Sequence, residues 1–533
     1  MHLFTYDKTI LALRLFLGLL MCRVLYWGVF DQTIWFDESG QYWMSLGQSH
    51  FSPPLTSNGS LLEVWQRNVD SNLDPGGFTF LLRWWIKLVG SDLMTLRVFP
   101  SLFLILFLGI VLKFNLSISA SKLEKVLSYL FATFLMTSPM ILNYGFEIRA
   151  YSYSLALSTF LIVLSISYFK KPFNSYGRAL WLLSGLLAIF GRYSSIPIIL
   201  ACIVVTTYSR KSKSQKLKNQ KKLWFSLDNI AGMILMGFMT LTYIFVTREQ
   251  NNQSGKPPKY VDYIMLKDKS ISESFRIVVS NFYSLPGMLL LSLLIVSSIL
   301  ILTGNIKKLN IKWQGLAWIY LLSTILEIIL SLVGLLPWSL NTRWSIENYS
   351  FVGLSLLFIT QNVVHISFAW KKQRETVVAT ICSMALLFSI LGIGGNLSDF
   401  RSNRGFNVKL MDAMPNETVE FDFLVVDDGI YPDLRFYIEN EKAYSKYLPG
   451  WNPEKVIRFN FESGELNQLT NLLTKHQKEH ILLMLNASWD GAKEKRVFPI
   501  LKEIPSVFGL FSSKNAPAPS ESIQRKKSFS KAI

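Results

Sequence analysis

Long apolar runs recur along this chain and limit its possible folds more than any other feature. A helix that spans a membrane needs roughly 20 apolar residues, and about eleven runs approach or reach that length. They cover residues 9–30, 97–113, 123–142, 151–169, 179–191, 195–208, 227–247, 279–303, 314–336, 349–369 and 376–395. Half of the chain is hydrophobic and only 17% is charged, which excludes a soluble protein of this size. The sequence therefore predicts an all-α polytopic membrane protein with about eleven transmembrane helices.

One further apolar stretch, "GFTFLLRWWIKLVG" at residues 77–90, is not counted as a span. It is too short, and Thr79, Arg83 and Lys87 recur every four positions, so they form one polar stripe on an otherwise apolar helix. That pattern is typical of a helix that lies in the membrane interface. We therefore expect an interfacial helix in the loop that follows the first span.

Basic residues fall in the connections that follow the even-numbered predicted helices. These connections contain Lys113, Lys122, Lys125, Lys170, Lys171, Arg178, residues 210–222, Lys307, Lys308, Lys312, Lys371, Lys372 and Arg374. Because basic loops stay in the cytoplasm, we predict a multi-pass protein of the plasma (cytoplasmic) membrane, with its N-terminus inside and its C-terminal region outside. This topology accounts for the net charge of +18, so no nucleic-acid partner is expected.

The composition becomes that of a soluble domain from about residue 419. Strands are expected at residues 419–429, 456–461 and 481–486, and an amphipathic helix at residues 465–480. The final residues are rich in Ser, Pro and Lys, which is typical of disorder. The predicted organisation is a transmembrane domain at residues 1–396, a small extracytoplasmic α/β domain at residues 397–510 and a disordered tail at residues 511–533.

Two adjacent acids, Asp37 and Glu38, follow the first apolar run in the segment "IWFDESGQYW". The aromatic neighbours place them near the outer headgroup level, where Trp and Tyr concentrate. A carboxylate in such a partly dry setting binds a proton more readily than in water, and it can act as a general base on a hydroxyl. The alternative is a solvated loop acid beside an aromatic belt.

The remainder of the first outer loop carries further polar residues. Residues 72–103, "NLDPGGFTFLLRWWIKLVGSDLMTLRVFPSLF", combine Asp74, a Pro-Gly-Gly turn, the predicted interfacial helix and Arg97. With the acidic pair, this segment resembles the GT-C glycosyltransferases, in particular the protein O-mannosyltransferase-like and lipid A aminoarabinose transferase-like enzymes. The matching residues are Asp37 and Glu38, the turn Asp74, Pro75 and Gly76, the helix end Val89 and Gly90, and the step Arg97, Pro100 and Ser101. Asp74 stands where the family has a His.

A second segment, "NYGFEIRAYSYSLAL" at residues 143–157, resembles the family's Glu-x-Arg-x-Tyr sequence through Glu147, Arg149 and Tyr151. The topology derived from the basic loops puts this segment on the same outer side as the acidic pair. Ionisable residues at a membrane boundary indicate function by default. The alternative is a structural ion pair that caps a helix.

Two further outer loops contain arginine. "FGRYSS" includes Arg192 and Tyr193, and "LPWSLNTRWSIENYS" includes Arg343 and Glu347. A lipid phosphate that leaves during a reaction needs a cation, and the planar guanidinium of Arg suits it. The alternative is that each Arg only extends its charged end to the membrane surface.

The resemblance implies an inverting glycosyltransferase that moves a sugar from a polyprenyl-phosphate donor to an acceptor hydroxyl on the outer face of the membrane. The acceptor would be a glycan, a lipid or a protein. Asp37 would be the general base and Glu38 its catalytic neighbour. The implied substrate-binding residues are Asp74, Arg97, Glu147, Arg149, Tyr151, Arg192 and Arg343.

A divalent cation is the one cofactor considered, with Glu38 and Asp74 as candidate ligands. Membrane lipids surround the predicted spans in any reading. The alternative function is a carrier or flippase for a lipid-linked sugar. Such proteins tend to have inverted repeats and charges near the middle of the membrane, and the sequence pattern displays neither.

Overall fold

The structure is a computed structural model in which most of the described residues form helices. The described residues are 6–31, 33–71, 74–119, 121–169, 173–214, 227–254, 270, 272–273, 276, 285–308, 310–333, 335, 343–355, 357, 422–442, 444, 451–459, 466–475, 481–486 and 507–512. The chain divides into two compact units. Unit 1 comprises Met1–Val29, Asn68–Leu81 and Arg97–Asn396, and unit 2 comprises Phe30–Arg67, Leu82–Leu96 and Leu397–Ile533.

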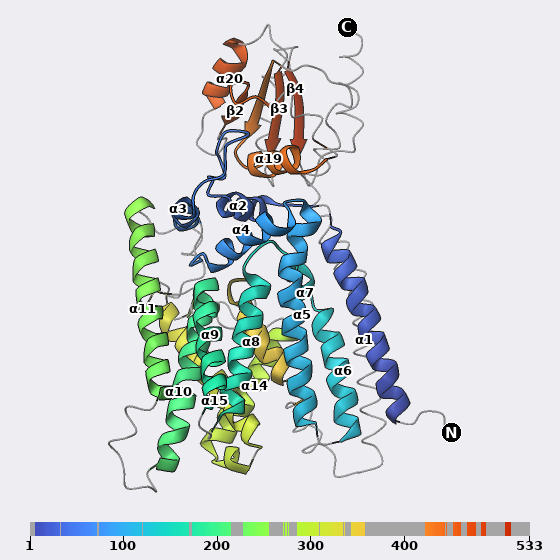
Figure 1. The fold of residues 1–533 in the computed structure, drawn as a ribbon, viewed down its shortest axis with the longest axis vertical. Coiled ribbons are helices and arrows are strands. Elements are labelled where there is room, and N and C mark those ends of the chain that lie inside the picture. The colour runs from blue at the N-terminus through green and yellow to red at the C-terminus, as the bar shows by residue number, and fades with distance from the viewer. Residues whose placement is uncertain are drawn as a thin grey trace. The chain divides into compact units, whose positions relative to one another are not determined.

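Unit 1 is built from helices (Figure 1). They are α1 (Tyr6–Val29), α5 (Leu93–Ile118), α6 (Lys122–Met136), α7 (Pro139–Tyr144), α8 (Tyr151–Ser167), α9 (Ser175–Gly191), η1 (Tyr193–Ser195), α10 (Ile196–Ser214), α11 (Leu227–Ser254), α14 (Leu285–Leu302), η3 (Asn305–Lys308), α15 (Ile311–Leu332) and η4 (Arg343–Asn348). Within the described part of the chain, three helices are long and apolar enough to cross a membrane, at Lys8–Val29, Leu93–Ile118 and Ile311–Leu332. The prediction of a largely helical chain with apolar helices long enough to span a membrane is confirmed.

Helices occur at each predicted apolar run from residues 9–30 to residues 314–336, although their boundaries move by several residues. The run at residues 123–142 is divided into α6 and α7 at Pro139, because proline cannot continue a helix that precedes it. The next run, at residues 349–369, is helical over residues 349–355. The last run, at residues 376–395, lies outside the described residues, and the number of spans stays a prediction.

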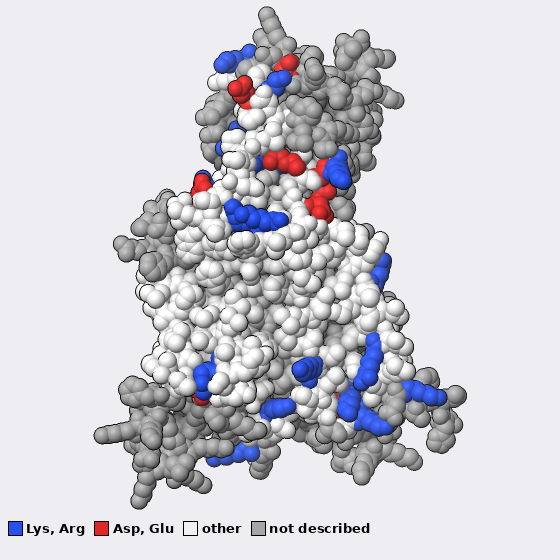
Figure 2. Space-filling model, in the orientation of Figure 1, with Lys and Arg blue, Asp and Glu red and all other residues white. Residues whose placement is uncertain are grey.

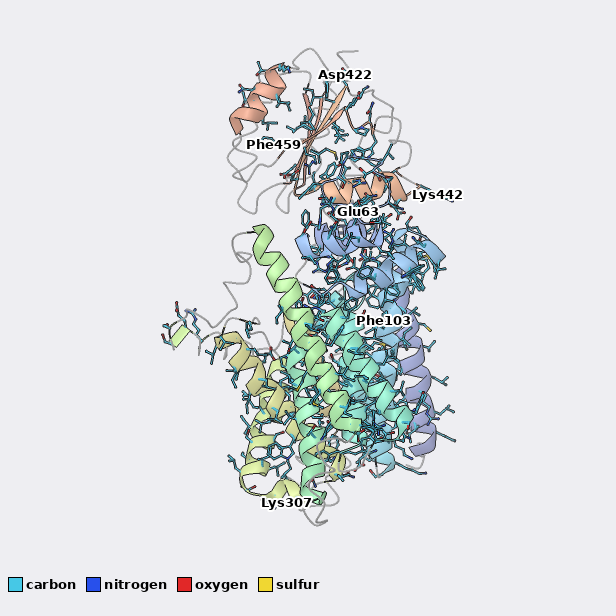
Figure 3. The ribbon with its side chains drawn as sticks, turned by 60° about the vertical axis from the view of Figure 1, so that its left-hand side comes forward. Glu63, Phe103, Lys307, Asp422, Lys442 and Phe459 are labelled. Carbon is cyan, nitrogen blue, oxygen red and sulfur yellow. The ribbon has the colours of Figure 1, made fainter. Side chains whose placement is uncertain are left out.

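Basic side chains gather at one end of unit 1. Arg178 Nε, in the first turn of α9, lies 2.5 Å from Asp228 Oδ1 at the start of α11. Lys312 Nζ, at the start of α15, donates a hydrogen bond to Ser117 Oγ at the end of α5 (3.1 Å). Lys307 lies at the same end, where α14 and α15 are joined (Figure 3), and Figure 2 shows Lys and Arg side chains over this region. Among the basic residues that the sequence singled out, Arg178, Lys307 and Lys312 therefore lie at the same end of unit 1, whereas Lys170, Lys171, residues 215–222, Lys371, Lys372 and Arg374 lie outside the described residues.

Helix α4 (Gly77–Val89) covers the stretch that was predicted to form an interfacial helix. Two of the three residues of its polar stripe bind other parts of the chain. Thr79 Oγ1 donates to Asn68 Oδ1 (2.6 Å), and Arg83 Nη1 donates to the carbonyl oxygen of Ser45 (3.2 Å). The exposed side chains are Lys87 and several apolar residues, which include Leu81, Trp84 and Leu88. The helix is amphipathic as predicted, but much of its polar stripe binds protein.

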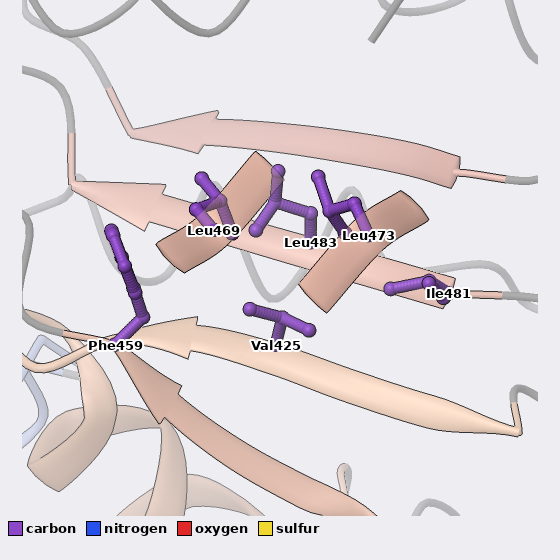
Figure 4. Packing of buried hydrophobic residues seen from close by; sticks show 6 residues of the cluster. All are labelled: Val425, Phe459, Leu469, Leu473, Ile481 and Leu483. Atoms are coloured by element: carbon purple, nitrogen blue, oxygen red, sulfur yellow. The ribbon is translucent and has the colours of Figure 1, made fainter. Parts of the chain in front are cut away.

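Unit 2 contains a four-stranded parallel sheet with the strand order β2-β1-β3-β4. The strands are β1 (Phe423–Asp427), β2 (Val456–Phe459), β3 (Ile481–Asn486) and β4 (Val507–Ser512). β1 pairs with strands on both sides, which explains its continuous apolar sequence. Helix α20 (Leu466–Lys475) packs Leu469 and Leu473 against Val425 and Leu483 of the sheet (Figure 4).

The small α/β region predicted near the C-terminus is confirmed in part by β1, β2, β3 and α20. Two of its elements were not predicted. Strand β4 includes Phe511 and Ser512, which the sequence analysis placed in the tail. Helix α19 (Tyr431–Asn440) follows the acidic turn after β1 and has Pro432 in its first turn, where the missing amide hydrogen costs nothing.

Candidate functional site

The predicted acidic pair lies in the first turn of helix α2 (Phe36–Ser45) of unit 2. Asp37 is half-buried, whereas Glu38 is fully buried. Acidic residues stabilise the positive N-terminal end of a helix, and this local role accounts for two acids at the start of α2. Only Asp37 has a side chain that is open enough to meet a substrate directly.

Helix α2 is held by α19, which comes from the C-terminal part of the same unit. Ser39 Oγ donates a hydrogen bond to Asp433 Oδ1, although these residues lie 394 positions apart in the sequence. Trp43 Nε1 donates to the carbonyl oxygen of Pro432 (3.0 Å), and the Arg435 guanidinium lies 3.8 Å from the centre of the Trp43 ring. The segment that carries the acidic pair is therefore fixed by a distant helix that the sequence analysis missed.

Asp74 lies in a turn of unit 1 that is fixed by hydrogen bonds. Asn68 Nδ2 donates to the backbone carbonyl of Asp74 (2.7 Å), and Thr79 Oγ1 orients the same Asn68 side chain. Gly76 has a φ of +97°, and a Cβ atom there would lie 3.0 Å from Asn68 Nδ2. The Asp-Pro-Gly-Gly turn thus needs glycine at position 76, and its geometry sets the direction of the Asp74 side chain.

Arg192, at the end of α9, joins two acidic residues from distant segments. Its Nε atom lies 3.4 Å from Asp74 Oδ1, and its Nη1 atom lies 3.5 Å from Glu347 Oε1. The Arg192 side chain is only 5% exposed, and that of Glu347 only 1%. Burial lowers the pKa of the Arg192 guanidinium, but the charges of Glu347 and Asp74 outweigh this effect and hold the pKa above its usual value. Arg192 therefore stays positively charged.

Glu347 is further fixed by two hydroxyl groups. Ser154 Oγ, in the first turn of α8, donates to Glu347 Oε1 (2.6 Å), and Ser194 Oγ donates to the same oxygen (2.9 Å). Its second oxygen, Oε2, is buried and has no hydrogen-bond partner among the described residues. The next residue, Asn348, donates to Glu327 Oε2 in α15 (3.1 Å). A series of polar contacts thus links Asp74, Arg192 and Glu347, and the neighbouring Asn348 extends it to the apolar helix α15.

Two arginines lie against the ring of Tyr151. The Cζ atom of Arg192 is 4.8 Å from the ring centre and that of Arg149 is 5.7 Å from it, which is within the range of cation–π attraction. Glu147, two residues before Arg149, is fully buried. Arg97 is also fully buried, and its Nη1 atom donates to the carbonyl oxygen of Phe146 (3.2 Å). The guanidinium groups of Arg97 and Arg192 therefore lie beside the two ends of the segment from Phe146 to Tyr151.

The structure gathers Asp74, Arg149, Tyr151 and Arg192 of the predicted set, and adds Glu347. Arg97 and Glu147 adjoin this group through the backbone around Phe146. Arg343 begins η4, but its side chain lies outside the described residues. Asp37 and Glu38 belong to unit 2. The sequence analysis missed the following residues: Ser154, Ser194, Glu327 and Asn348. Ser154, Ser194 and Asn348 lie in segments that the sequence analysis singled out for other residues, and Glu327 is an ionisable residue inside the predicted span at residues 314–336, which is a signal in itself.

A divalent cation finds no ready set of ligands in the described part of the chain. No group of three or more His, Cys, Asp or Glu residues there is arranged to hold a metal ion. The Asp74 carboxylate instead pairs with Arg192, so a cation would have to displace the guanidinium. Glu38 is fully buried in α2. The divalent cation therefore stays a prediction, and the mechanism proposed for this chain does not depend on it.

Comparison with known protein families finds none that matches this sequence, and comparison with curated proteins finds no match either.

Proposed function

We propose that this chain is an inverting membrane glycosyltransferase that takes a sugar from a polyprenyl-phosphate donor and transfers it to an acceptor hydroxyl. The observation that carries the proposal is the buried cluster around Arg192. Asp74, Glu347 and Tyr151 come from three distant segments and meet at one guanidinium. Burying charges is costly, so a cluster of this kind at the end of apolar helices favours a functional site.

In this proposal Asp37 is the general base. The acceptor oxygen attacks the anomeric carbon while Asp37 takes the hydroxyl proton. The bond between the anomeric carbon and the phosphate oxygen breaks, and the polyprenyl phosphate leaves with the electron pair. Attack from the side opposite the leaving group inverts the anomeric configuration. Arg149, half-buried beside Tyr151, stabilises the negative charge that develops on the departing phosphate.

Arg192 has a different role from Arg149. Its distances of 3.4 Å and 3.5 Å to Asp74 and Glu347 exceed the roughly 2.7–2.9 Å of tight charge-assisted hydrogen bonds. Two acids nevertheless balance its charge. We assign Arg192, which the buried Glu347 holds in place, to orienting Asp74, whose 14% exposed side chain in turn contacts a hydroxyl group of the donor sugar.

The proposed topology has about eleven spans, with the basic connections in the cytoplasm and the Arg192 cluster on the outer side. Arg178 lies in the first turn of α9, and Arg192 follows its last residue. At 1.5 Å per residue, these two positions are about 21 Å apart along the helix. The cluster and the basic end of unit 1 are thus separated by most of the thickness of a membrane, as the proposal requires.

The test is incubation of the purified protein in lipid nanodiscs with a panel of polyprenyl-phosphate sugars. Release of free polyprenyl phosphate, dependent on an added acceptor, is expected with at least one donor. A variant with Arg149→Gln should retain donor binding but lose most of the turnover, because it lacks the cation for the leaving group. Arg178→Gln, at the other end of α9, is the matched control and should turn over at the wild-type rate.

The same preparation distinguishes a carrier from an enzyme. In sealed vesicles a carrier moves the labelled donor across the bilayer without breaking its phosphate bond. Movement of intact donor with no release of polyprenyl phosphate from any member of the panel would replace the proposed function. Labelling of single cysteines at positions 38 and 147 would not measure access from either side of the membrane, because the side chains at both positions are fully buried.

A further inference from the structure

Helix α19 makes an unusually complete set of polar contacts with α2 in unit 2. Besides the Ser39–Asp433 hydrogen bond, Tyr42 OH donates to Asn440 Oδ1 (2.6 Å) at the far end of α19. The backbone amide of Ile34, just before α2, donates to Tyr437 OH (2.9 Å). The contacts therefore fix both ends of α2 and the segment that leads into it.

Two of the residues involved are charged and have no exposure to solvent. Asp433 and Arg435 are both 0% exposed. Arg435 Nη2 donates to Gln48 Oε1, and its Nε atom donates to Glu439 Oε1 (2.9 Å). The guanidinium also covers the Trp43 ring. Burying a carboxylate and a guanidinium costs free energy. Here the carboxylate binds Ser39 of α2, and the guanidinium packs on Trp43 of the same helix and binds Gln48 just beyond it.

That short helix carries the half-buried acid. Asp37 is two residues before Ser39, and the rigid turn between them means that the Asp433 contact sets the direction in which Asp37 points. A base must be held within a fraction of an ångström of its productive position. The contact with α19 has the geometry to provide this.

We propose that α19 is a positioning element for the acidic pair, with Asp433 and Arg435 as positioning residues for the proton transfer by Asp37. This inference rests on the proposed function. It makes the C-terminal part of the chain, which the sequence presents as a separate domain, a working part of the catalytic unit. Neither residue touches substrate in this account, because both act through α2.

The test compares Asp433→Ala, Asp433→Asn and Arg435→Met in the full-length protein in nanodiscs. Asp433→Ala removes the acceptor for Ser39, and a misplaced base lowers kcat by roughly 10- to 100-fold with the donor KM unchanged. Asp433→Asn keeps an acceptor oxygen and should recover much of the rate. Arg435→Met keeps the volume but not the planar charge, so it should resemble Asp433→Ala.

A readout that does not need activity is hydrogen exchange of the α2 amides. It should become faster in Asp433→Ala and Arg435→Met. The matched control is Leu473→Ala, which opens the core formed by α20 with Val425, Ile481 and Leu483 of the sheet (Figure 4). Compared with Asp433→Ala and Arg435→Met at the same thermal midpoint, Leu473→Ala should leave both kcat and the exchange of the α2 amides close to wild type.

Three results would overturn the inference or separate it from the proposed function. Wild-type kcat and wild-type α2 exchange in both Asp433→Ala and Arg435→Met would contradict it. If kcat in these two variants falls no more than it does in Leu473→Ala at the same thermal midpoint, α19 only stabilises the fold, and this result also contradicts the inference. No turnover by the wild-type protein with any donor would contradict the proposed function itself, and α2 exchange would then decide whether α19 holds α2.

Discussion

The Nη1 atom of Arg192 lies 3.5 Å from Glu347 Oε1, with both side chains almost fully withdrawn from solvent. Ser194, two residues after Arg192, also donates its hydroxyl to the same carboxylate oxygen of Glu347. This pair links the end of α9 to η4. An isolated charge in such surroundings lowers the stability of the fold, so removing either residue of the pair should destabilise the protein.

Replacing Glu347 should therefore destabilise the protein through Arg192. Glu347→Ala leaves the buried guanidinium with Asp74 as its remaining acidic partner and is expected to cost about 3 kcal/mol of folding free energy. Glu347→Gln keeps the oxygen that accepts from Ser154 and Ser194, so its cost should be smaller. The thermal midpoint of the purified protein measures both effects.

The control for this prediction is Arg178→Gln at the opposite end of α9. The Arg178 side chain is 22% exposed and therefore keeps more contact with water than Arg192, so loss of its pair with Asp228 should cost less than Glu347→Ala. An unchanged midpoint in Glu347→Ala would show that the Arg192 pair contributes nothing to stability.

Gly76→Ala should disturb the turn that carries Asp74. Position 76 has a φ of +97°, and the added Cβ would meet Asn68 Nδ2 at 3.0 Å. The backbone strain alone costs about 1–2 kcal/mol, and the displaced turn should reduce sugar transfer as well. Gly109→Ala in α5 is the comparison, because a Cβ there meets nothing within 4 Å, and it should be neutral or stabilising. Equal midpoints for the two variants would refute the role assigned to the turn.

Glu441 gives unit 2 a defined dependence on pH. Its carboxylate accepts from the backbone amide of Leu93 (2.9 Å), but burial, the largest effect, raises the pKa of Glu441 above its usual value. A raised pKa in the folded state means that Glu441 contributes stability below its unfolded pKa and loses that contribution as pH rises through the folded pKa.

Glu441→Gln, which cannot ionise, should therefore gain stability relative to wild type as pH rises from about 4 towards neutrality. Above the folded pKa the difference should level off. Hydrogen exchange of the α19 amides, followed from acid to neutral pH, measures it. Glu454→Gln, an exposed acid in the same unit, should show no such trend, and a parallel trend in both variants would contradict the assignment to Glu441.

Local patterns made much of the fold predictable. The apolar runs predicted the helices of unit 1, and the four-residue spacing of Thr79, Arg83 and Lys87 predicted α4. The predicted limits of β3 agree with the structure, because its uninterrupted apolar sequence is typical of a buried parallel strand. The sequence could not show that the polar stripe of α4 binds protein, since that depends on Asn68 and Ser45.

Contacts between distant segments account for what the sequence could not predict. Asp74 and Arg192 were each singled out from their own loops, but only the fold brings them within 3.4 Å. The contact of Ser39 with Asp433 spans 394 positions and has no local signal at either residue. Helix α19 was missed because its buried face includes Asp433 and Arg435 beside apolar residues, so it lacks a clean amphipathic period.

The most direct test of the central claim is single-turnover sugar transfer by Asp37→Asn, with the donor that the wild-type protein uses. The substitution removes the proposed base and keeps the shape, so the rate should fall by roughly 10²–10⁴ with an unchanged thermal midpoint. Glu63→Gln is the matched acid-to-amide control, because Glu63 is exposed on α3 (Leu61–Ser71) and its capping bond with the Ser60 amide suits glutamine as well. It should transfer at the wild-type rate. Transfer by Asp37→Asn within a few-fold of that rate would contradict the account.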